Sequence, residues 1–556
     1  MANLFTEKDL QRPLSRLFQV IKLERKEISS VYLYAILAGL LQLAVPLAVQ
    51  AIINFVLAGR ISTSIVVLIF MVVASVFFAG LLQVNQMKII EKVQQRLFAR
   101  YSFEFAWRIP KLDLKSVDHI YLPEFVNRFF DTIVLEKSLS KLLLDIPAAT
   151  IQVLFGLILL SLYANVFILF SLLTLFILFL VIRFTYKRGL ATSLQESEDK
   201  YAVAGWLEEI ARVTKSFHFS RSSTLPVDKT DKLVANFLQS RTSHFKVLLM
   251  QYWSMIGFKI LITASMLIVG AVLLVRNEIN VGQFAAAEIV ILLVLSSVER
   301  LINSLDKMYD ILTSVEKLGK IIDKPLEAEG TLELKKELKG LSIAVKDLSF
   351  SYQNEVPNLQ NISFEAKAGE KICIAGSNGS GKSTLLKLLT GAYSDFKGSI
   401  NINQVPVGNY QPDSLRGEIG IFFHQQDLFK GSLYENVTLG DTSITTAQII
   451  ELASKIGIAD FIQSSRNGFD TEIDTSGKRL SSVVIRKILL LRALIAEPQL
   501  LLLEEPWQGF DEQSTQKIKQ YLLHEIPNTT VLVISNDKDF EKQCNRVITL
   551  NEGKLI

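Results

Sequence analysis

The sequence is poor in the residues that build metal centres and disulfides. Only two cysteines, Cys373 and Cys544, stand far apart among 556 residues, and five histidines are scattered along the chain. No cysteine and histidine group has the spacing of metal ligands, which argues against a zinc site, and we expect no structural disulfide. None of the histidines pairs with a nucleophile, and four are interpreted as surface or packing residues: His119, His218, His244 and His524.

A strong charge bias and a signal peptide are also missing. The net charge of +4 is too small for a chain of this size to indicate a nucleic-acid partner. The first 27 residues mix acids and bases with short apolar runs, unlike the basic and then apolar order of a cleavable signal peptide. Insertion into a membrane must then be directed by the chain's own first apolar span.

Long apolar runs are what the sequence does have. Hydrophobic residues make up 49% of the chain. They gather into stretches near the roughly 20 residues that a helix needs to cross a bilayer core about 30 Å thick. The number and length of these stretches argue against a soluble helical domain. We predict six transmembrane helices: residues 31–56, 64–82, 146–162, 166–184, 248–275 and 284–302.

Basic residues beside the spans predict which side each end faces. Cytoplasmic loops carry an excess of Lys and Arg, and these residues gather before the first span and after the second, fourth and sixth. The opposite turns are short and hold little beyond Arg60 and Arg276. Both ends of the membrane domain are therefore predicted to be cytoplasmic. The connections at residues 83–147 and 185–246 are long, polar and compatible with helix, so we expect them to extend the helices into the cytoplasm.

A glycine-rich turn is the strongest motif in the chain. Residues 376–384 fill the pattern G-x-x-x-x-G-K-[ST] between an apolar strand and a helix. Glycines let the backbone wrap around phosphates, and the helix N-terminus offers free N–H donors. Lys382 is predicted to neutralise the outer phosphates of ATP, and Ser383 to bind Mg²⁺. The predicted phosphate-binding residues are Gly376, Ser377, Asn378, Gly379, Ser380, Gly381, Lys382, Ser383 and Thr384.

A second motif places two acidic residues at the end of a predicted strand. The run of four leucines at 500–503 predicts a buried strand with Glu504 and Glu505 at its carboxyl end, where α/β sheets place their chemistry. Glu504 is predicted to orient Mg²⁺ through its water shell, and Glu505 to polarise the attacking water. The alternative is a core strand followed by a solvated acidic turn.

The two motifs and the apolar runs together predict the domain organisation. The fold class is a six-helix transmembrane α domain followed by an α/β P-loop NTPase domain. A polar stretch with Pro325 and Gly330 separates the two domains and is interpreted as a linker. The predicted bounds are 1–30 for a cytoplasmic segment, 31–320 for the transmembrane domain, 321–340 for the linker and 341–556 for the nucleotide-binding domain.

These motifs resemble the ABC transporter superfamily, and the six-span layout resembles its exporters with fused membrane and nucleotide-binding domains. The resemblance covers essentially the whole chain and implies a dimer, in which each ATP lies between the phosphate loop of one half and the signature segment of the other. It implies that Tyr352 stacks on adenine and that Trp206–Val213 is a coupling helix. The alternatives are an ordinary strand tyrosine and a plain amphipathic helix. Because no peptidase domain precedes the first span, we expect no leader-peptide cleavage.

The signature segment departs from the family pattern. In place of Leu-Ser-Gly-Gly-Gln the sequence reads Leu480-Ser-Ser-Val-Val484. Ser481 keeps the hydroxyl that the family directs to a γ-phosphate across the dimer. Ser482 and Val483 replace glycines, and their side chains are expected to obstruct the approach of the backbone to phosphate.

Other departures surround the predicted catalytic site. Asn536 stands at the position of the switch histidine, and an asparagine can hydrogen-bond a phosphate but cannot carry an imidazolium charge. Glu504 replaces the usual aspartate. His424 occupies the place of the glutamine that contacts the site, and a shift of one residue puts Gln425 there instead, so both registers remain open. Trp507–Asp511 stands where the family has a turn like Thr-Ser-Ala-Leu-Asp, and only Asp511 matches that turn.

The sequence therefore predicts an ATPase coupled to export across the plasma (inner) membrane, with ATP and Mg²⁺ as cofactors. Its substrate is predicted to be a peptide, a protein or a hydrophobic compound, since PLAVQAIINFVL resembles type I secretion and peptide exporters. Membrane lipids and a second half-transporter, identical or different, are the expected partners. Glu505, Lys382 and Asn536 are the predicted catalytic residues, and Tyr352, Gln425 and Ser481 complete the ATP site. Two alternatives are an ATP-binding accessory or sensor half-transporter with little hydrolysis, and a nucleotide-gated channel on an exporter frame.

Overall fold

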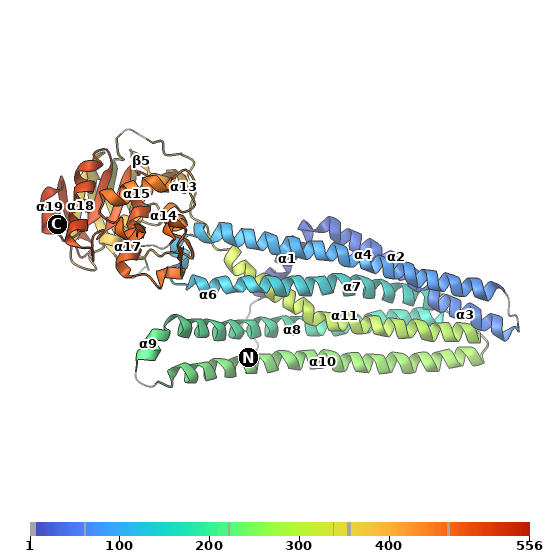
Figure 1. The fold of residues 1–556 in the computed structure, drawn as a ribbon. Helices are drawn as coiled ribbons and strands as arrows, with labels where there is room; N and C mark the ends of the chain where they lie inside the picture. The colour runs from blue at the N-terminus through green and yellow to red at the C-terminus, as the bar shows by residue number, and fades with distance from the viewer. Residues whose placement is uncertain (1–6, 60–62, 221–222, 337–338, 353–356, 464–466) are drawn as a thin grey trace. The chain divides into compact units, whose positions relative to one another are not determined.

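The computed structural model describes all residues except 1–6, 60–62, 221–222, 337–338, 353–356 and 464–466 (Figure 1). It divides into two compact units. One comprises the chain up to Pro110 together with Ile120–Lys324, and the other comprises Lys111–His119 and Pro325–Ile556. Arg60, which we predicted in an outer turn, lies outside the described residues.

The first unit is built from helices, several of them very long (Figure 1). The longest, α10, has 51 residues, or about 75 Å at 1.5 Å per residue, which is more than twice the thickness of a bilayer core. Among the described residues, six helical stretches are long and apolar enough to cross a membrane, which confirms the predicted number of apolar helices. The helices are α1 (Glu7–Leu23), α2 (Arg25–Gln42), α3 (Ala44–Leu57), α4 (Thr63–Arg108), α6 (Leu122–Val126), α7 (Asp131–Ser161), α8 (Val166–Arg212), α9 (Thr214–Phe219), α10 (Leu225–Val275) and α11 (Val281–Ile322).

The first predicted span is broken near its middle. Helix α2 ends at Gln42 and α3 begins at Ala44, with Leu43 between them. Pro46 explains the break, because its ring nitrogen has no hydrogen to donate to the carbonyl one turn earlier. The predicted span at residues 31–56 therefore lies within two consecutive helices that the proline divides.

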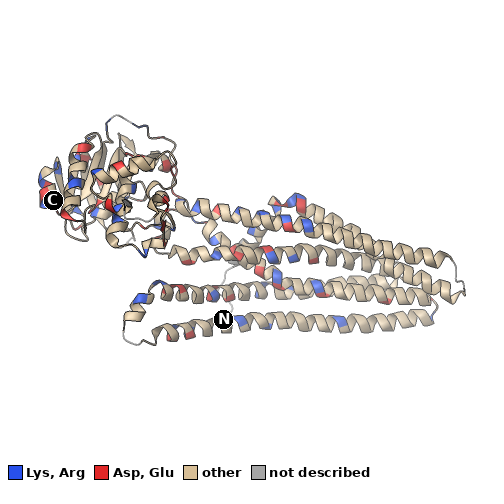
Figure 2. Ribbon diagram, viewed as in Figure 1, with Lys and Arg blue, Asp and Glu red and all other residues tan. Residues whose placement is uncertain are grey.

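Charge is unevenly distributed along the long helices of this unit. Figure 2 shows acidic and basic residues gathered toward one end of the helices, while the other end is mostly uncharged. The apolar ends contain the six spans, and the charged ends contain the segments that we predicted to extend beyond them. Helix α11 begins at a capping box in which Asn280 and Gln283 exchange side-chain and backbone hydrogen bonds of 2.8 and 2.9 Å.

The segment predicted as a coupling helix has a different position. Trp206 lies inside α8, which continues without interruption to Arg212. Its indole N–H donates to the carbonyl of Pro226 at 3.2 Å, and the Lys229 ammonium lies 3.9 Å from the ring centroid. The short separate helix that follows is α9, so residues 206–212 are the end of a long helix and not a helix of their own. A helical pattern in the sequence does not show where one helix ends and the next begins.

The second unit is an α/β domain with two main sheets. Strand β3 (Lys371–Gly376) lies in a six-stranded sheet of order β12-β11-β3-β10-β9-β6, in which all pairs are parallel except β11 and β12. A four-stranded antiparallel sheet has the order β2-β1-β4-β5. The remaining strands are β1 (Ile343–Phe350), β2 (Leu359–Ala366), β4 (Lys397–Ile402), β5 (Val405–Pro406), β6 (Ile419–Phe422), β7 (Gly431–Ser432), β8 (Glu472–Ile473), β9 (Leu500–Glu504), β10 (Thr530–Ile534), β11 (Arg546–Asn551) and β12 (Lys554–Leu555).

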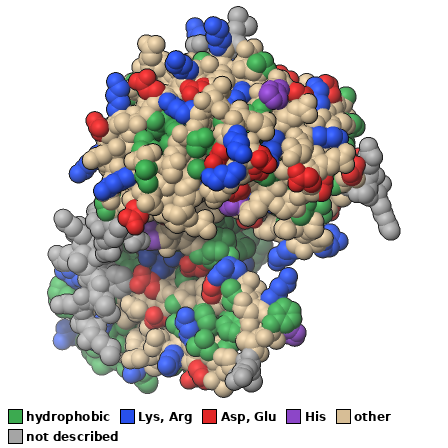
Figure 3. All heavy atoms as spheres, turned by 90° about the vertical axis from the view of Figure 1, so that its left-hand side faces the viewer, with side chains coloured by type: hydrophobic (Ala, Val, Ile, Leu, Met, Phe, Trp, Pro, Cys, Tyr) green, Lys and Arg blue, Asp and Glu red, His purple; other side chains and the backbone are tan. Residues whose placement is uncertain are grey.

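Helices cover these sheets and enclose two hydrophobic cores. Cys373 and Cys544 are both free and contribute to the same core, although they lie far apart in the sequence. On the face shown in Figure 3, acidic and basic side chains are intermixed and hydrophobic ones form small groups. The helices are α12 (Lys382–Leu389), α13 (Pro412–Gly417), α14 (Leu433–Thr438), α15 (Thr446–Lys455), α16 (Asp460–Gln463), α17 (Ser482–Leu494), α18 (Glu512–Gln520) and α19 (Lys538–Gln543).

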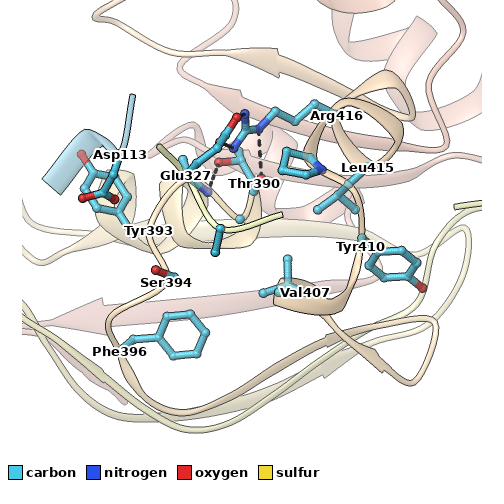
Figure 4. Close-up of a pocket in the computed structure, with 15 residues that line it drawn as sticks. Asp113, Glu327, Thr390, Tyr393, Ser394, Phe396, Val407, Tyr410, Leu415 and Arg416 are labelled. Atoms are coloured by element: carbon cyan, nitrogen blue, oxygen red, sulfur yellow. Dashed lines mark hydrogen bonds and ion pairs between the residues drawn. The ribbon is translucent and has the colours of Figure 1, made fainter. Parts of the chain in front are cut away.

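A short segment of the first half of the chain packs into this α/β unit. It contains helix α5 (Leu114–Val117), capped by Asp113, whose side chain accepts from the Ser116 N–H at 3.1 Å. The Tyr393 hydroxyl donates to the Asp118 carboxylate at 3.0 Å. Asp113 and Tyr393 also line a cavity of about 80 Å³, together with the ion-paired Glu327 and Arg416 (Figure 4). The first of the two long polar connections thus belongs partly to the α/β unit.

Candidate nucleotide-binding site

The phosphate loop follows β3 and leads into α12. Gly376 and Gly381 have φ values of +141° and +95°, and a Cβ at these positions would lie 2.1 Å from the Leu550 carbonyl oxygen and 2.7 Å from that of Asn358. Only glycine fits both the backbone conformation and the space. At Gly379, by contrast, a Cβ would meet no atom within 4 Å. The loop is therefore tightly packed at its ends and has open space beside its centre.

Lys382 is the first residue of α12 and folds over this loop. Its ammonium group donates to the carbonyl oxygens of Gly376 and Ser377, both at 2.7 Å. Burial lowers the pKa of Lys382, and the carboxylates of Glu505 and Glu504 oppose that effect. Ser380 has a buried hydroxyl with no hydrogen-bond partner among the described residues. A phosphate in the open loop would provide acceptors for both groups, so the residues fit the predicted ligand.

The predicted Mg²⁺ ligands meet at the carboxyl end of the sheet. The Ser383 hydroxyl donates to one carboxylate oxygen of Glu504, and the backbone N–H of His424 donates to the other at 3.2 Å. Strands β9 and β3 both flank β10, so parallel pairing brings Glu504 and the phosphate loop to the same edge. A hydroxyl and a carboxylate in contact are the oxygen donors that Mg²⁺ prefers. The Glu504 carboxylate therefore contacts Ser383 although glutamate has one methylene more than the aspartate usual in the family.

Glu505 has an unusual backbone conformation for its residue type. Its φ is +46°, and its N–H donates to the Ile534 carbonyl at 2.9 Å. Its carboxylate accepts from the Ser535 hydroxyl at 3.4 Å. Burial raises the pKa of Glu505, with Ser535, His424 and Lys382 acting in the opposite direction. A raised carboxylate pKa favours proton acceptance, which agrees with the predicted role toward water.

The remaining predicted residues lie in three different settings. The Asn536 side-chain oxygen accepts from the Gly376 N–H at 3.4 Å, so Asn536 lies at the phosphate loop. The Tyr352 hydroxyl donates to Thr384 at 3.4 Å, and its ring packs edge-on against Phe350 and Tyr393. The exposed Gln425 accepts from Lys387 at 2.8 Å.

The signature residue Ser481 caps a helix in this chain. Its hydroxyl accepts from the Val484 N–H at 3.3 Å and starts α17. Ser481 is exposed, as a residue that serves a phosphate held by a second half would need to be. Ser482 and Val483 follow it in the first turn of α17.

Arg486 is a residue of this site that the motif comparison missed. Its guanidinium, on α17, donates to Nδ1 of His424 at 2.9 Å and to the backbone carbonyl of Glu505. It also lies 5.1 Å from the Phe422 ring centroid. The sequence signal was available, because Arg486 follows the altered signature closely in IRKILLLRAL, but only the fold brings it to Glu505.

Comparisons with known proteins identify the class of this domain. The ABC transporter family pattern matches residues 359–508, which contain the phosphate loop, α17 and both acids. The domain formed by these residues therefore belongs to the ABC transporters. Over its whole length the chain has the fold of an ABC exporter: it superposes on a solved bacterial Atm1-family ABC exporter with ATP bound, with a TM-score of 0.83 and 18% identity, covering 96% of this chain and 95% of that one.

Relatives with curated names point to the same class. The chain is 30% identical over 334 residues to the leukotoxin translocation ATP-binding protein LktB of Mannheimia haemolytica, and equally so to LktB of Bibersteinia trehalosi. The match covers 59% of this chain and 46% of LktB, so it spans about half the length of these relatives. The sequence-based recognition of a half-size ABC exporter, with six apolar helices followed by a nucleotide-binding domain, is confirmed.

Proposed function

We propose that the chain is one half of an ATP-driven exporter that acts as a dimer in the plasma (inner) membrane. The observation that carries this proposal is the meeting of Lys382, Ser383, Glu504 and Glu505 at one sheet edge, in a chain with six helices able to cross a membrane. The nucleotide-binding domain lies in the cytoplasm. The exported substrate is a peptide, a protein or a hydrophobic compound.

In this proposal, Lys382 and the loop amides hold the phosphates of ATP, and Ser383 and Glu504 hold Mg²⁺ between them. When bound, Mg²⁺ neutralises charge on the phosphates and aligns the outermost one. Glu505 orients water and accepts its proton, which its raised pKa favours. Ser481 of the second half completes the site, and closure of the two halves drives the membrane helices between inward and outward access.

A second function is favoured by a specific observation. Asn536 lies at the phosphate loop where the family places a histidine, and Val483 stands in the signature where the family has glycine. Both changes weaken hydrolysis more than binding. They support an accessory or sensor half-transporter that binds ATP and hydrolyses little of it alone.

Hydrolysis by the purified full-length protein in liposomes separates the two functions. We expect slow but measurable Mg-ATP turnover, and Glu505→Gln is expected to lower kcat by roughly 100-fold or more while ATP still binds. The matched control is Glu552→Gln, because Glu552 is exposed in a turn and has the same φ of +46°. If the wild type turns over ATP no faster than Glu505→Gln, the accessory function is the correct one.

A further inference from the structure

Arg486 connects the signature helix to the backbone of Glu505 and, through His424, to Glu504 of its own chain. One guanidinium nitrogen donates to Nδ1 of His424 at 2.9 Å, and another donates to the carbonyl of Glu505. The backbone N–H of His424 in turn donates to the Glu504 carboxylate at 3.2 Å. Because arginine has donors only, His424 accepts through Nδ1 and its ring is fixed in one orientation. The two hydrogen bonds of the Arg486 guanidinium therefore connect α17 to the loop after β6 and to the residue after β9.

The guanidinium occupies this place at an energetic cost. It is half-buried, and its Nε has no hydrogen-bond partner among the described residues. Burial lowers the pKa of Arg486, and the carboxylates of Glu505 and Glu504 oppose that effect. A buried cation is retained only where neighbouring charge and hydrogen bonds offset its desolvation. Here the offsetting groups are the two acids predicted to act on Mg²⁺ and water.

The contact with Glu505 fixes a strained peptide. Glu505 has a φ of +46°, a region that a residue with a side chain seldom adopts. Its N–H donates to the Ile534 carbonyl, and its own carbonyl accepts from Arg486 and from the Gln508 N–H at 3.1 Å. Both backbone groups of Glu505 are thus anchored, which fixes the point from which its side chain extends toward Ser535.

We propose that Arg486 is a positioning residue that compensates for the absent switch histidine. Asn536 contacts the phosphate loop without a positive charge, whereas Arg486 brings a permanent one to the backbone carbonyl of Glu505 and to His424, whose N–H donates to Glu504. It holds Glu505 in place and supplies, from the chain's own signature helix, the cation that Asn536 lacks. This inference rests on the proposed function, because it concerns hydrolysis at the same site.

A double-mutant cycle between Arg486 and Asn536 tests the inference. With full-length protein in liposomes, Arg486→Gln is expected to lower kcat for Mg-ATP by at least about 30-fold in the wild-type background, with little change in KM. In the Asn536→His background, the same substitution is expected to cost about threefold. The two backgrounds then differ by about tenfold, or ~1.4 kcal/mol of coupling. Arg486→Lys keeps the positive charge but loses the planar pair of guanidinium donors. Its kcat is expected to lie between that of the wild type and that of Arg486→Gln.

The controls separate positioning from folding. Lys487→Gln removes a cation from the next position of α17 and is expected to leave kcat unchanged. Melting temperature and binding of the fluorescent analogue MANT-ATP show whether each variant is folded. Equal losses in the two backgrounds, or no loss on Arg486→Gln, would overturn the compensating role of Arg486. A wild type that binds MANT-ATP without hydrolysing it would contradict the proposed function itself, and with it any role of Arg486 in turnover.

Discussion

Lys382→Ala is expected to weaken the binding of Mg-ATP by at least about tenfold. The ammonium group lies over the phosphate loop, where it now donates to two backbone carbonyls at 2.7 Å. A phosphate in the open loop offers a charged acceptor instead, and hydrogen bonds to charged groups are worth about 1.5–3 kcal/mol. Truncation removes these bonds and leaves an uncompensated negative charge beside Glu504 and Glu505.

Equilibrium titration with MANT-ATP in the presence of Mg²⁺ measures this effect. Lys397→Ala is the matched control, because Lys397 is an exposed lysine at the start of β4. Its affinity for the analogue is expected to equal that of the wild type. Equal affinity in the wild type and Lys382→Ala would show that residues 376–384 do not hold phosphate in the proposed way.

Restoring the family residues is expected to raise the rate of ATP hydrolysis by at least about tenfold. This corresponds to lowering the activation free energy by ~1.4 kcal/mol. The variant combines Ser482→Gly, Val483→Gly, Val484→Gln and Asn536→His. In a homodimer every site combines Asn536 of one chain with the altered signature of the other, so both defects act together. Loss of one transition-state donor alone typically costs roughly 10²–10³ in rate.

Steady-state hydrolysis by each protein expressed alone provides the measurement. Asn536→His without the signature changes separates the two contributions, and its gain is expected to be small because Arg486 already supplies a cation. In a heterodimer with an intact second half the defects fall in different sites, and restoration then has a smaller effect. If the unmodified protein alone matches the restored one, the departures from the family pattern do not limit turnover.

Local features of the sequence were sufficient to predict much of the fold. A membrane span needs only a long apolar run, and a phosphate loop needs glycines at fixed spacing between a strand and a helix. Both depend on neighbouring residues, so both are visible in one sequence. The break at Leu43 was not predicted, although Pro46, which cannot donate a backbone hydrogen bond, was a local signal for it.

Features that depend on distant contacts were not predictable. Asp118 packs beside Tyr393 in the α/β unit, although 275 residues separate them. The contact between Arg486 and Glu505 likewise depends on how the start of α17 meets the residue after β9. The sequence left open whether His424 or Gln425 serves the site. The structure places His424 against Glu504 and Arg486, and Gln425 beside Lys387.

ATP-driven change of access is the central claim, and labelling of single cysteines in intact cells tests it most directly. The probe position is Leu292 on α11, which is 60% exposed within a predicted span. Leu292→Cys is introduced after Cys373 and Cys544 are replaced by alanine. Two backgrounds are compared: Glu505→Gln, which is expected to hold ATP without hydrolysing it, and Lys382→Ala, which is expected to bind little.

An impermeant maleimide added outside is expected to label Leu292→Cys in the Glu505→Gln background and not in the Lys382→Ala background. Arg276→Cys, in a predicted outer turn, is expected to react in both. His119→Cys and Trp206→Cys, on the predicted cytoplasmic side, are expected to react in neither. Equal labelling of Leu292→Cys in the two backgrounds would contradict ATP-driven switching, and labelling at His119 or Trp206 would contradict the membrane orientation on which the account depends.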